Sequence, residues 1–382
     1  MSKVVGVLLP RSTDHPGFGF DILDGLRLRL AEEGLSDIRL VPENIGFGED
    51  RKEVYAKAEK LIMQDDAFCV VAYLSPANAE SLYALFETAG KALVVIDAGM
   101  NFASETPNKH AVHVSLQGIQ AAYMSGKKAG QNNAKVIMAT SFYDGGYRGP
   151  WAYHRGIIAA GGTIIHHYVS RYKEEEFTVQ PFLDAAKQHS AGVAGACFST
   201  YLAALFMNSL HKENGSAPQM DFYCSSYMVE EQTLRTYQLP ASGRFYAYVP
   251  WCSSVDNEEN EHFKSVLKTK KNKEANLFHL MGWEAGIVVA EYIRQMEKTV
   301  SPIGDMMKGW SYNSPRGVVK VHPAAGHAFG PMYYAELKQE AGDKPYVDIL
   351  ETVETHESDY LRIMNDKPEG PTSGWFNQYL CT

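Results

Sequence analysis

The sequence predicts an α/β protein with two Rossmann-like lobes, each built on a parallel sheet, joined by three hinge crossings. Three observations lead to this prediction. The 382 residues are too many for one ordinary hydrophobic core and suit two lobes. Short apolar runs alternate with amphipathic stretches, a pattern typical of parallel sheets covered by helices on both faces. The predicted strands also exceed what one twisted sheet usually holds, so we expect two sheets.

The elements follow one another in a regular order from the N-terminus. Val4–Leu9 is continuously apolar and begins with β-branched residues, which is typical of a buried strand. In the next stretch, 21–33, Ile22, Leu26 and Leu30 recur at helical spacing. Further strands are predicted at 39–41, 69–74, 93–96, 112–114, 136–140, 164–169, 193–199 and 222–224. Further helices are predicted at 51–64, 77–89, 119–130, 150–160, 179–189 and 201–212.

The expected crossings divide each lobe in two along the chain. The first crossing is predicted near Ser115, where a strand end gives way to a new helix. The second is predicted at Tyr248-Val249-Pro250 and the third within 319–323. The expected lobe 1 comprises residues 1–116 and 250–321. The expected lobe 2 comprises residues 117–249 and 322–382.

Charge and segment composition exclude several function classes. The chain has 36 Lys and Arg against 45 Asp and Glu, which opposes a nucleic-acid groove lined by clustered cations. No apolar run approaches the roughly 20 residues that cross a bilayer, so we expect no membrane insertion. The cysteines are odd in number and form no C-x-x-C pair, which excludes a dense disulfide framework and leaves room for one bridge. They are Cys69, Cys197, Cys224, Cys252 and Cys381.

The sequence offers no catalytic constellation. It contains neither a G-x-S-x-G nucleophile elbow nor a P-loop, and Gly17-Phe18-Gly19 lacks the third glycine of a dinucleotide fingerprint. His110 and His113 lie near a predicted strand end without an acidic helix partner. The adjacent His166 and His167 would point to opposite faces of a strand. We therefore expect no enzyme activity, no metal and no cofactor.

Polar and aromatic residues do follow the predicted strands, where open parallel sheets bind ligands. Ser75 follows a strand and opens a helix, whose N-terminal amides favour a carbonyl or carboxylate oxygen. Asp97 and Gly99 follow the next strand, and Gly99 would let a ligand approach the backbone. The corresponding residues of the second lobe are Phe142, Tyr143, Tyr147, Ser199, Thr200, Tyr201, Ser225, Ser226 and Tyr227. The alternatives are a simple helix cap for Ser75 and ordinary half-buried positions for the tyrosines.

The order and spacing of several segments resemble a known family. They are Val5-Gly6-Val7-Leu8-Leu9-Pro10, Gly17-Phe18-Gly19, Val70 to Ser75, Tyr147-Arg148-Gly149, Val249-Pro250-Trp251, Gly282-Trp283-Glu284-Ala285 and Pro315-Arg316-Gly317-Val318-Val319. Across about residues 4–340 the sequence resembles type I periplasmic binding proteins of ABC transporters, in the branched-chain amino acid, amide and urea group. This resemblance implies the type I periplasmic-binding-protein fold.

The resemblance also implies ligand-binding residues. Asn101 stands where amino acid binders often place threonine, and Ser226 where branched-chain binders often place glutamate. The usual amino acid clamp is therefore incomplete, which favours a less polar, aromatic or amide-bearing ligand. Asp97 and Tyr227 join the set because each follows a predicted strand, and Trp251 because it lies in the segment that resembles the family's return to the first lobe. The predicted ligand-binding residues are Phe18, Tyr73, Ser75, Asp97, Gly99, Asn101, Tyr147, Tyr201, Ser226, Tyr227, Trp251 and Phe278.

The expected function is that of an extracytoplasmic solute-binding protein. It would close two lobes on a small polar or aromatic, amino-acid-like or amide-like ligand and deliver it to the permease of an ABC importer. We expect a periplasmic or cell-surface protein, monomeric or weakly dimeric, whose mature chain starts at an added Met1 without a secretory leader. The alternative is a cytosolic ligand-sensing regulator resembling the amide sensor of amidase operons. An enzyme on the same scaffold is a third class.

Overall fold

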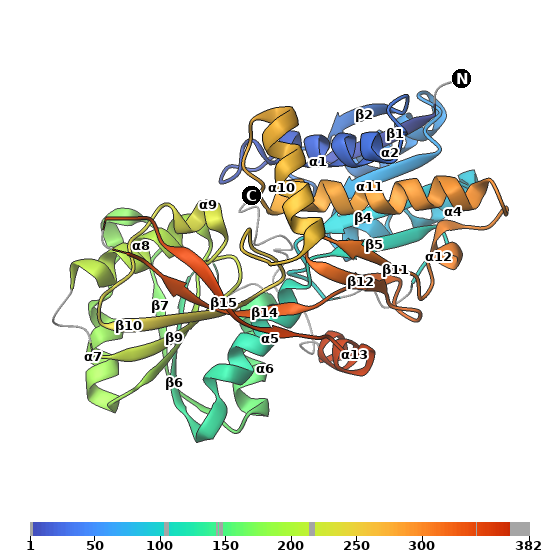
Figure 1. Ribbon diagram of the computed structural model, residues 1–382. Helices are drawn as coiled ribbons and strands as arrows, with labels where there is room; N and C mark the ends of the chain where they lie inside the picture. The colour runs from blue at the N-terminus through green and yellow to red at the C-terminus, as the bar shows by residue number, and fades with distance from the viewer. Residues whose placement is uncertain are drawn as a thin grey trace. The chain divides into compact units, whose positions relative to one another are not determined.

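A computed structural model describes residues 3–102, 107–142, 144, 148–213, 218–340 and 342–366 (Figure 1). The chain forms two units that are each discontinuous in sequence. Unit 1 comprises the residues up to Leu116 together with Val255–Pro331, and unit 2 comprises Gln117–Ser254 together with the described residues from Met332 onward. Each unit contains one sheet with helices packed around it.

Unit 1 is built on a mixed, largely parallel sheet. Its described strands are β1 (Val4–Leu9), β2 (Arg39–Asn44), β3 (Cys69–Tyr73), β4 (Ala92–Asp97), β5 (Ala111–Ser115), β11 (Ser311–Ser314), β12 (Gly317–Val321) and β13 (His327–Phe329). Their order is β11-β12-β13-β5-β4-β3-β1-β2. All neighbours from β2 to β13 pair in parallel, whereas β11, β12 and β13 pair antiparallel. The strands β1, β3, β4 and β5 are buried along their whole length, as their continuous apolar runs predict.

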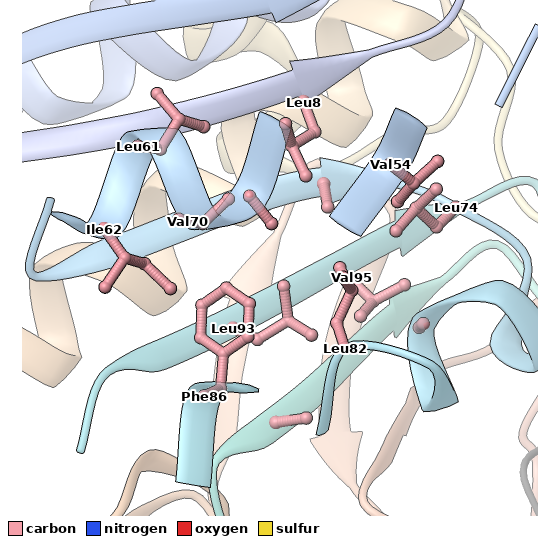
Figure 2. Packing of buried hydrophobic residues seen from close by; sticks show 14 of the residues in the cluster. Leu8, Val54, Leu61, Ile62, Val70, Leu74, Leu82, Phe86, Leu93 and Val95 are labelled. Carbon is pink, nitrogen blue, oxygen red and sulfur yellow. The ribbon is translucent and has the colours of Figure 1, made fainter. Parts of the chain in front are cut away.

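Helices cover both faces of this sheet. They are α1 (Phe18–Glu32), α2 (Arg51–Met63), α3 (Pro76–Glu80), α4 (Tyr83–Ala89), α10 (Glu258–Lys271), α11 (Leu277–Met296) and α12 (Ile303–Met306). The packing of α2 and α4 against β1, β3 and β4 forms a hydrophobic core. Figure 2 shows Leu61 of α2 and Phe86 of α4 among the side chains of this core, and both are fully buried.

The helix pair α1 and α11 packs with its backbones in near contact. A Cβ atom added at Gly282 would lie 2.0 Å from the carbonyl oxygen of Ile22, and one added at Gly25 would lie 2.1 Å from that of His279. Only glycine fits at either position. This close packing sets the position of the first turn of each helix, where Phe18 and Phe278 lie.

Unit 2 repeats this plan with its own sheet. Its described strands are β6 (Lys135–Ser141), β7 (Thr163–Ser170), β8 (Val193–Cys197), β9 (Met220–Cys224), β10 (Gly243–Val249), β14 (Met332–Lys338) and β15 (Tyr346–Val353), in the order β15-β14-β10-β9-β8-β6-β7. The pairs β10–β14 and β14–β15 are antiparallel and the other pairs are parallel. The helices are α5 (Gly118–Ala129), α6 (Arg148–Ala159), α7 (Gln180–His189), α8 (Thr200–Lys212), α9 (Glu231–Leu234) and α13 (Glu357–Asn365).

Two local expectations differ from the structure. The single helix expected at 77–89 is two helices, α3 and α4. At the break the Ser81 and Leu82 amides donate to carbonyls three residues back, those of Asn78 and Ala79, instead of continuing the α-helical pattern. The sheets are also not wholly parallel, because β11–β12 and β14–β15 are joined by connections too short for a parallel crossover.

The second and third crossings lie later in the chain than expected. Residues before Val255 belong to unit 2, where the Ser253 amide donates to Glu231 and the Ser254 hydroxyl donates to the Val347 carbonyl. Residues up to Pro331 belong to unit 1, because β13 pairs with β5. Apolar periodicity predicts elements but not which sheet a short late strand joins.

The cysteines in the described part of the chain are buried. Cys69 begins β3, Cys197 and Cys224 end β8 and β9, and Cys252 follows β10. Burial raises the pKa of the Cys224 thiol to about 12. These residues therefore act as small apolar side chains rather than as nucleophiles.

Candidate ligand-binding site

The loops that follow β1, β3, β4 and β5 lie at one edge of the unit 1 sheet, because parallel strands end at the same edge. The predicted residues Phe18, Tyr73, Ser75, Asp97, Gly99, Asn101 and Phe278 belong to this unit. Ligands of open α/β sheets bind at such an edge. The geometry of each loop is set by hydrogen bonds and ring contacts within unit 1.

An aromatic cluster forms beside the end of β3. The ring centroids of Phe18 and Tyr73 are 5.5 Å apart in an edge-on arrangement, and those of Phe18 and Phe278 are also 5.5 Å apart. The His15 ring meets Phe278 edge-on at 5.0 Å. All four side chains are buried. Phe18 therefore contacts two other residues, Tyr73 and Phe278, that lie far from it in the sequence and that the sequence also predicted as ligand contacts.

A cavity of about 500 Å³ opens beside Phe18 in unit 1. Its wall is mostly apolar and includes Leu9, Pro10 and Leu23, with Arg11 and Glu43 as the charged residues. The Glu43 carboxylate is already paired with Lys57 and Lys60, and these partners hold its pKa below the ordinary value. The cavity is large enough for a small ring.

Ser75 is the N-cap of α3. Its hydroxyl oxygen accepts a hydrogen bond from the Asn78 amide at 3.3 Å, and its side chain is buried. The cap uses the hydroxyl as an acceptor, so the Ser75 hydroxyl proton can still be donated to a ligand oxygen. The Asn78 side chain holds this turn by donating to the Gly48 carbonyl at 2.8 Å.

Asp97 organises the loop after β4. Its Oδ1 accepts hydrogen bonds from the Gly99 amide and, at 3.0 Å, from the Ser115 hydroxyl. Its Oδ2 is buried and has no hydrogen-bond partner in the described part of the chain. Burial outweighs these two hydrogen bonds and raises the pKa of Asp97 to about 7. Gly99 has φ of 72°, which glycine adopts without strain, and Asn101 is half-buried.

The predicted residues of unit 2 have different exposures. Ser226, Tyr227 and Trp251 are buried, whereas Tyr201 is 48% exposed and its hydroxyl donates to Glu174 at 3.3 Å. Ser226 and Tyr227 follow β9, and Tyr201 lies in the first turn of α8. Tyr147 lies outside the described residues, as does Tyr143. Among these side chains Tyr201 is the accessible one.

One cluster in unit 1 carries side chains of the metal-ligating type. Asp21, Asp24 and His279 offer ligand atoms within 4.8 Å of one another. Lys271 and Lys273 already bind these carboxylates, at 2.6 Å from Asp24 and 2.8 Å from Asp21 respectively. Two ammonium groups neutralise the two carboxylates, so this cluster is an ion-pair network that fastens α1 to the start of α11.

Sequence reasoning missed two residues of this edge. His15 carries no strand-end signal, because it lies inside the loop between β1 and α1, yet it contacts Phe278. Ser115 ends β5 and holds Asp97, although the sequence marked it only as a crossing point. Its position after a buried strand, like that of Ser75, is the signal that could have identified it.

A family model for periplasmic binding proteins matches residues 4–343. The chain belongs to the periplasmic binding protein family. This result confirms the resemblance and the two-lobed type I fold that the sequence predicted. A sequence comparison with functionally described proteins finds no match.

Solved structures of other periplasmic binding proteins share the fold. The ABC transporter substrate-binding protein from Sphaerobacter thermophilus has a TM-score of 0.77 and 18% identity, over 93% of this chain and 98% of that chain. A Rhodopseudomonas palustris solute-binding protein in complex with 4-hydroxybenzoate has a TM-score of 0.73 and 19% identity, over 93% and 97%. A branched-chain amino acid binding protein from Burkholderia xenovorans has a TM-score of 0.74 and 13% identity, over 94% and 96%.

Members of this family are associated with transport rather than with catalysis. Within the described part of the chain, each helix is too short or too polar to cross a membrane.

Proposed function

We propose that this periplasmic binding protein captures a small ligand with an aromatic or amide-bearing body and delivers it to an ABC importer. The ligand binds at the strand ends of unit 1 and is enclosed when the second lobe closes on it. The protein is not an enzyme and acts in the periplasm or at the cell surface, as a monomer or weak dimer.

The observation that carries this proposal is the aromatic cluster at the strand edge. Phe18 lines a cavity of ligand size and is in ring contact with Tyr73 and Phe278. Aromatic side chains bury about 150–250 Å² each, which makes them strong contacts for a ring. Ser75 can donate one hydrogen bond to a carbonyl or carboxylate oxygen of the ligand. Asn101, Tyr147, Tyr201, Ser226, Tyr227 and Trp251 are the further proposed contacts.

The ligands named for some of the similar structures support this choice, while other similar structures are amino acid binding proteins. The Rhodopseudomonas palustris proteins hold 3,4-dihydroxybenzoic acid, 4-hydroxybenzoate and benzoate. Each of these ligands is an aromatic ring with a carboxylate. Arg11, which lines the cavity beside Phe18 and lies 4.9 Å over the Phe47 ring, is a cation available to a carboxylate of this kind.

A thermal-shift panel tests the ligand class. Benzoate, 4-hydroxybenzoate, benzamide, urea, L-phenylalanine and L-leucine are each added at increasing concentration. A ligand present at about 100 times its Kd stabilises the folded state by about 2.7 kcal/mol. We expect aromatic acids or amides to raise the melting temperature. A panel in which only L-leucine does so would contradict the proposed ligand class.

A matched pair of variants tests the site. Phe278→Leu removes a ring at the strand edge, whereas Phe86→Leu removes an equally buried ring from the core of the same unit. Both variants should lose stability. We expect only Phe278→Leu to weaken the ligand-induced shift, and an equal loss in both would place the site elsewhere.

Small-angle X-ray scattering tests closure. The radius of gyration should fall when the compound that gives the largest thermal shift is bound at saturation, because a bridging ligand favours the closed state. Co-purification with a membrane permease supports delivery, and capture of a soluble regulatory protein instead would favour the ligand-sensing alternative.

A further inference from the structure

Arg316 and Glu284 form a fully buried ion pair in unit 1, with both side chains at 0% exposure. The Arg316 Nε donates to Glu284 Oε1 at 2.6 Å and its Nη2 donates to Oε2 at 3.0 Å, which is a two-pronged contact. The Ser314 hydroxyl donates to the same Oε1 at 2.5 Å. Removing two charges from water costs free energy that the attraction between them can fail to recover. The burial of this pair is therefore not by itself evidence that it stabilises the fold. The contacts around the pair indicate its role.

All three places where the chain leaves or enters unit 1 lie beside Arg316. The Nη2 of Arg316 donates to the Ser115 carbonyl at 3.1 Å, one residue before the chain leaves at Leu116. Asn257, just after the chain returns at Val255, donates to the carbonyl of the neighbouring Pro315 at 3.2 Å. At the last exit, which follows Pro331, an added Cβ on Gly330 would lie 3.7 Å from Nη1 of Arg316.

The same residues connect to the loop after β4. The Ser115 hydroxyl donates to Asp97 Oδ1, and the Leu116 amide donates to the Asp97 carbonyl at 3.1 Å. Asp97 in turn holds the Gly99 amide. A continuous chain of hydrogen bonds therefore runs from the loop of Gly99 through Ser115 to Arg316. A lysine could not replace Arg316, because the contacts to Glu284 and Ser115 use two nitrogens, Nε and Nη2, in the fixed geometry of one planar group.

We propose that Arg316, held by Glu284, is the positioning residue that joins the loop after β4 to the three chain crossings of unit 1. This proposal rests on the proposed function, in which a ligand binds at that loop. A ligand that orders the loop would then act on the crossings through Asp97 and Ser115. Arg316 donates to the carbonyl of Ser115, whose hydroxyl holds Asp97, so it acts through the residues that it positions.

Hydrogen exchange of the unliganded protein tests this role. The double variant Glu284→Met with Arg316→Met removes both charges together at similar volume, so it leaves no unpaired buried charge and is expected to fold. Amides in peptides containing Leu116, Asn257 and Gly330 should exchange at least about tenfold faster than in the wild type. The control Leu61→Ala removes a buried side chain from a hydrophobic core of unit 1 that does not include Ser115, Asn257 or Gly330. It should not reproduce this pattern.

A second variant separates the two parts of the network. Ser115→Ala removes the hydroxyl bonded to Asp97 but keeps the carbonyl bonded to Arg316. It should speed exchange at Gly99 while the peptides containing Asn257 and Gly330 keep their wild-type rates. The double variant should also broaden the distance distribution measured by small-angle X-ray scattering, which a purely structural role would not change.

The exchange and scattering experiments test the role of Arg316 in the unliganded protein. Faster exchange spread evenly through unit 1, the same pattern in Leu61→Ala, or an unchanged scattering profile would each overturn the role of Arg316. Failure of the ligand panel would overturn the proposed function and leave these exchange and scattering results unaffected.

Discussion

Replacing Asp97 with asparagine should stabilise the protein at alkaline pH far more than at acid pH. Burial raises the pKa of Asp97 from its ordinary value of 3.8 to about 7. The unfolded chain therefore loses its proton first as the pH rises. The stability that the protonated form of Asp97 contributes is fully present below pH 3.8. It declines as the pH rises from 3.8 to about 7 and is gone at higher pH. A shift of about three pKa units corresponds to about 4 kcal/mol.

The asparagine variant does not titrate and keeps the local geometry. Its carbonyl oxygen can accept the bonds from Gly99 and Ser115, and its amide nitrogen replaces Oδ2, which has no partner among the described residues. Between pH 5 and pH 8 the wild type should lose about 3 kcal/mol through Asp97 that the variant does not lose. Urea unfolding at the two pH values, followed by the fluorescence of the buried Trp283, measures this difference.

Subtracting the unfolding free energy of the wild type from that of the variant at each pH isolates the contribution of Asp97 from that of other titrating groups. Burial also raises the pKa of Glu230 in unit 2 to about 7, and burial lowers the pKa of His113 to about 3, but both groups are present in each protein. A difference in unfolding free energy that is equal at pH 5 and pH 8 would refute the account of a buried, protonated Asp97.

Three further predictions concern packing, acid and thiols. Gly282→Ala should lower the free energy of unfolding by about 1–3 kcal/mol in urea titrations, because the new Cβ would lie 2.0 Å from the Ile22 carbonyl oxygen. His113 is buried and its pKa is lowered to about 3, so its contribution to stability is present above pH 6.5 and is lost as the pH falls toward 3; His113→Gln should reduce that acid loss in urea titrations at pH 5 and 7. The buried cysteines of the described residues, such as Cys224, should react with iodoacetamide only after denaturation, as mapped by peptide mass spectrometry; labelling of the native protein at these positions would contradict their burial.

Much of the fold could be predicted from local patterns. A continuous apolar run such as Val4–Leu9 needs burial on both faces, and that requirement is visible without knowing its neighbours. The helix 77–89 was predicted wrongly because the break is a local switch of backbone hydrogen bonds at Ser81 and Leu82, which apolar periodicity does not record. The antiparallel pairing of β14 with β10 was not foreseen because it joins strands that are distant in sequence.

The candidate site was likewise predictable in part. The sequence placed Ser75, Asp97 and Gly99 after strands, and parallel pairing brings such loops to one edge. It could not show that Oδ1 of Asp97 is already occupied by Ser115 and Gly99, since that depends on the register between β4 and β5.

The sequence by itself determined the α/β class and the order of most elements, because these depend on local periodicity. Its segments also carried the resemblance to periplasmic binding proteins that the family model confirms. Only the tertiary structure decided that Phe18 and Phe278 share one aromatic cluster and that Arg316 lies beside all three crossings. The physical reason is that helix-pair packing at Gly25 and Gly282, and the burial of a paired charge, depend on surfaces contributed by segments far apart in the chain.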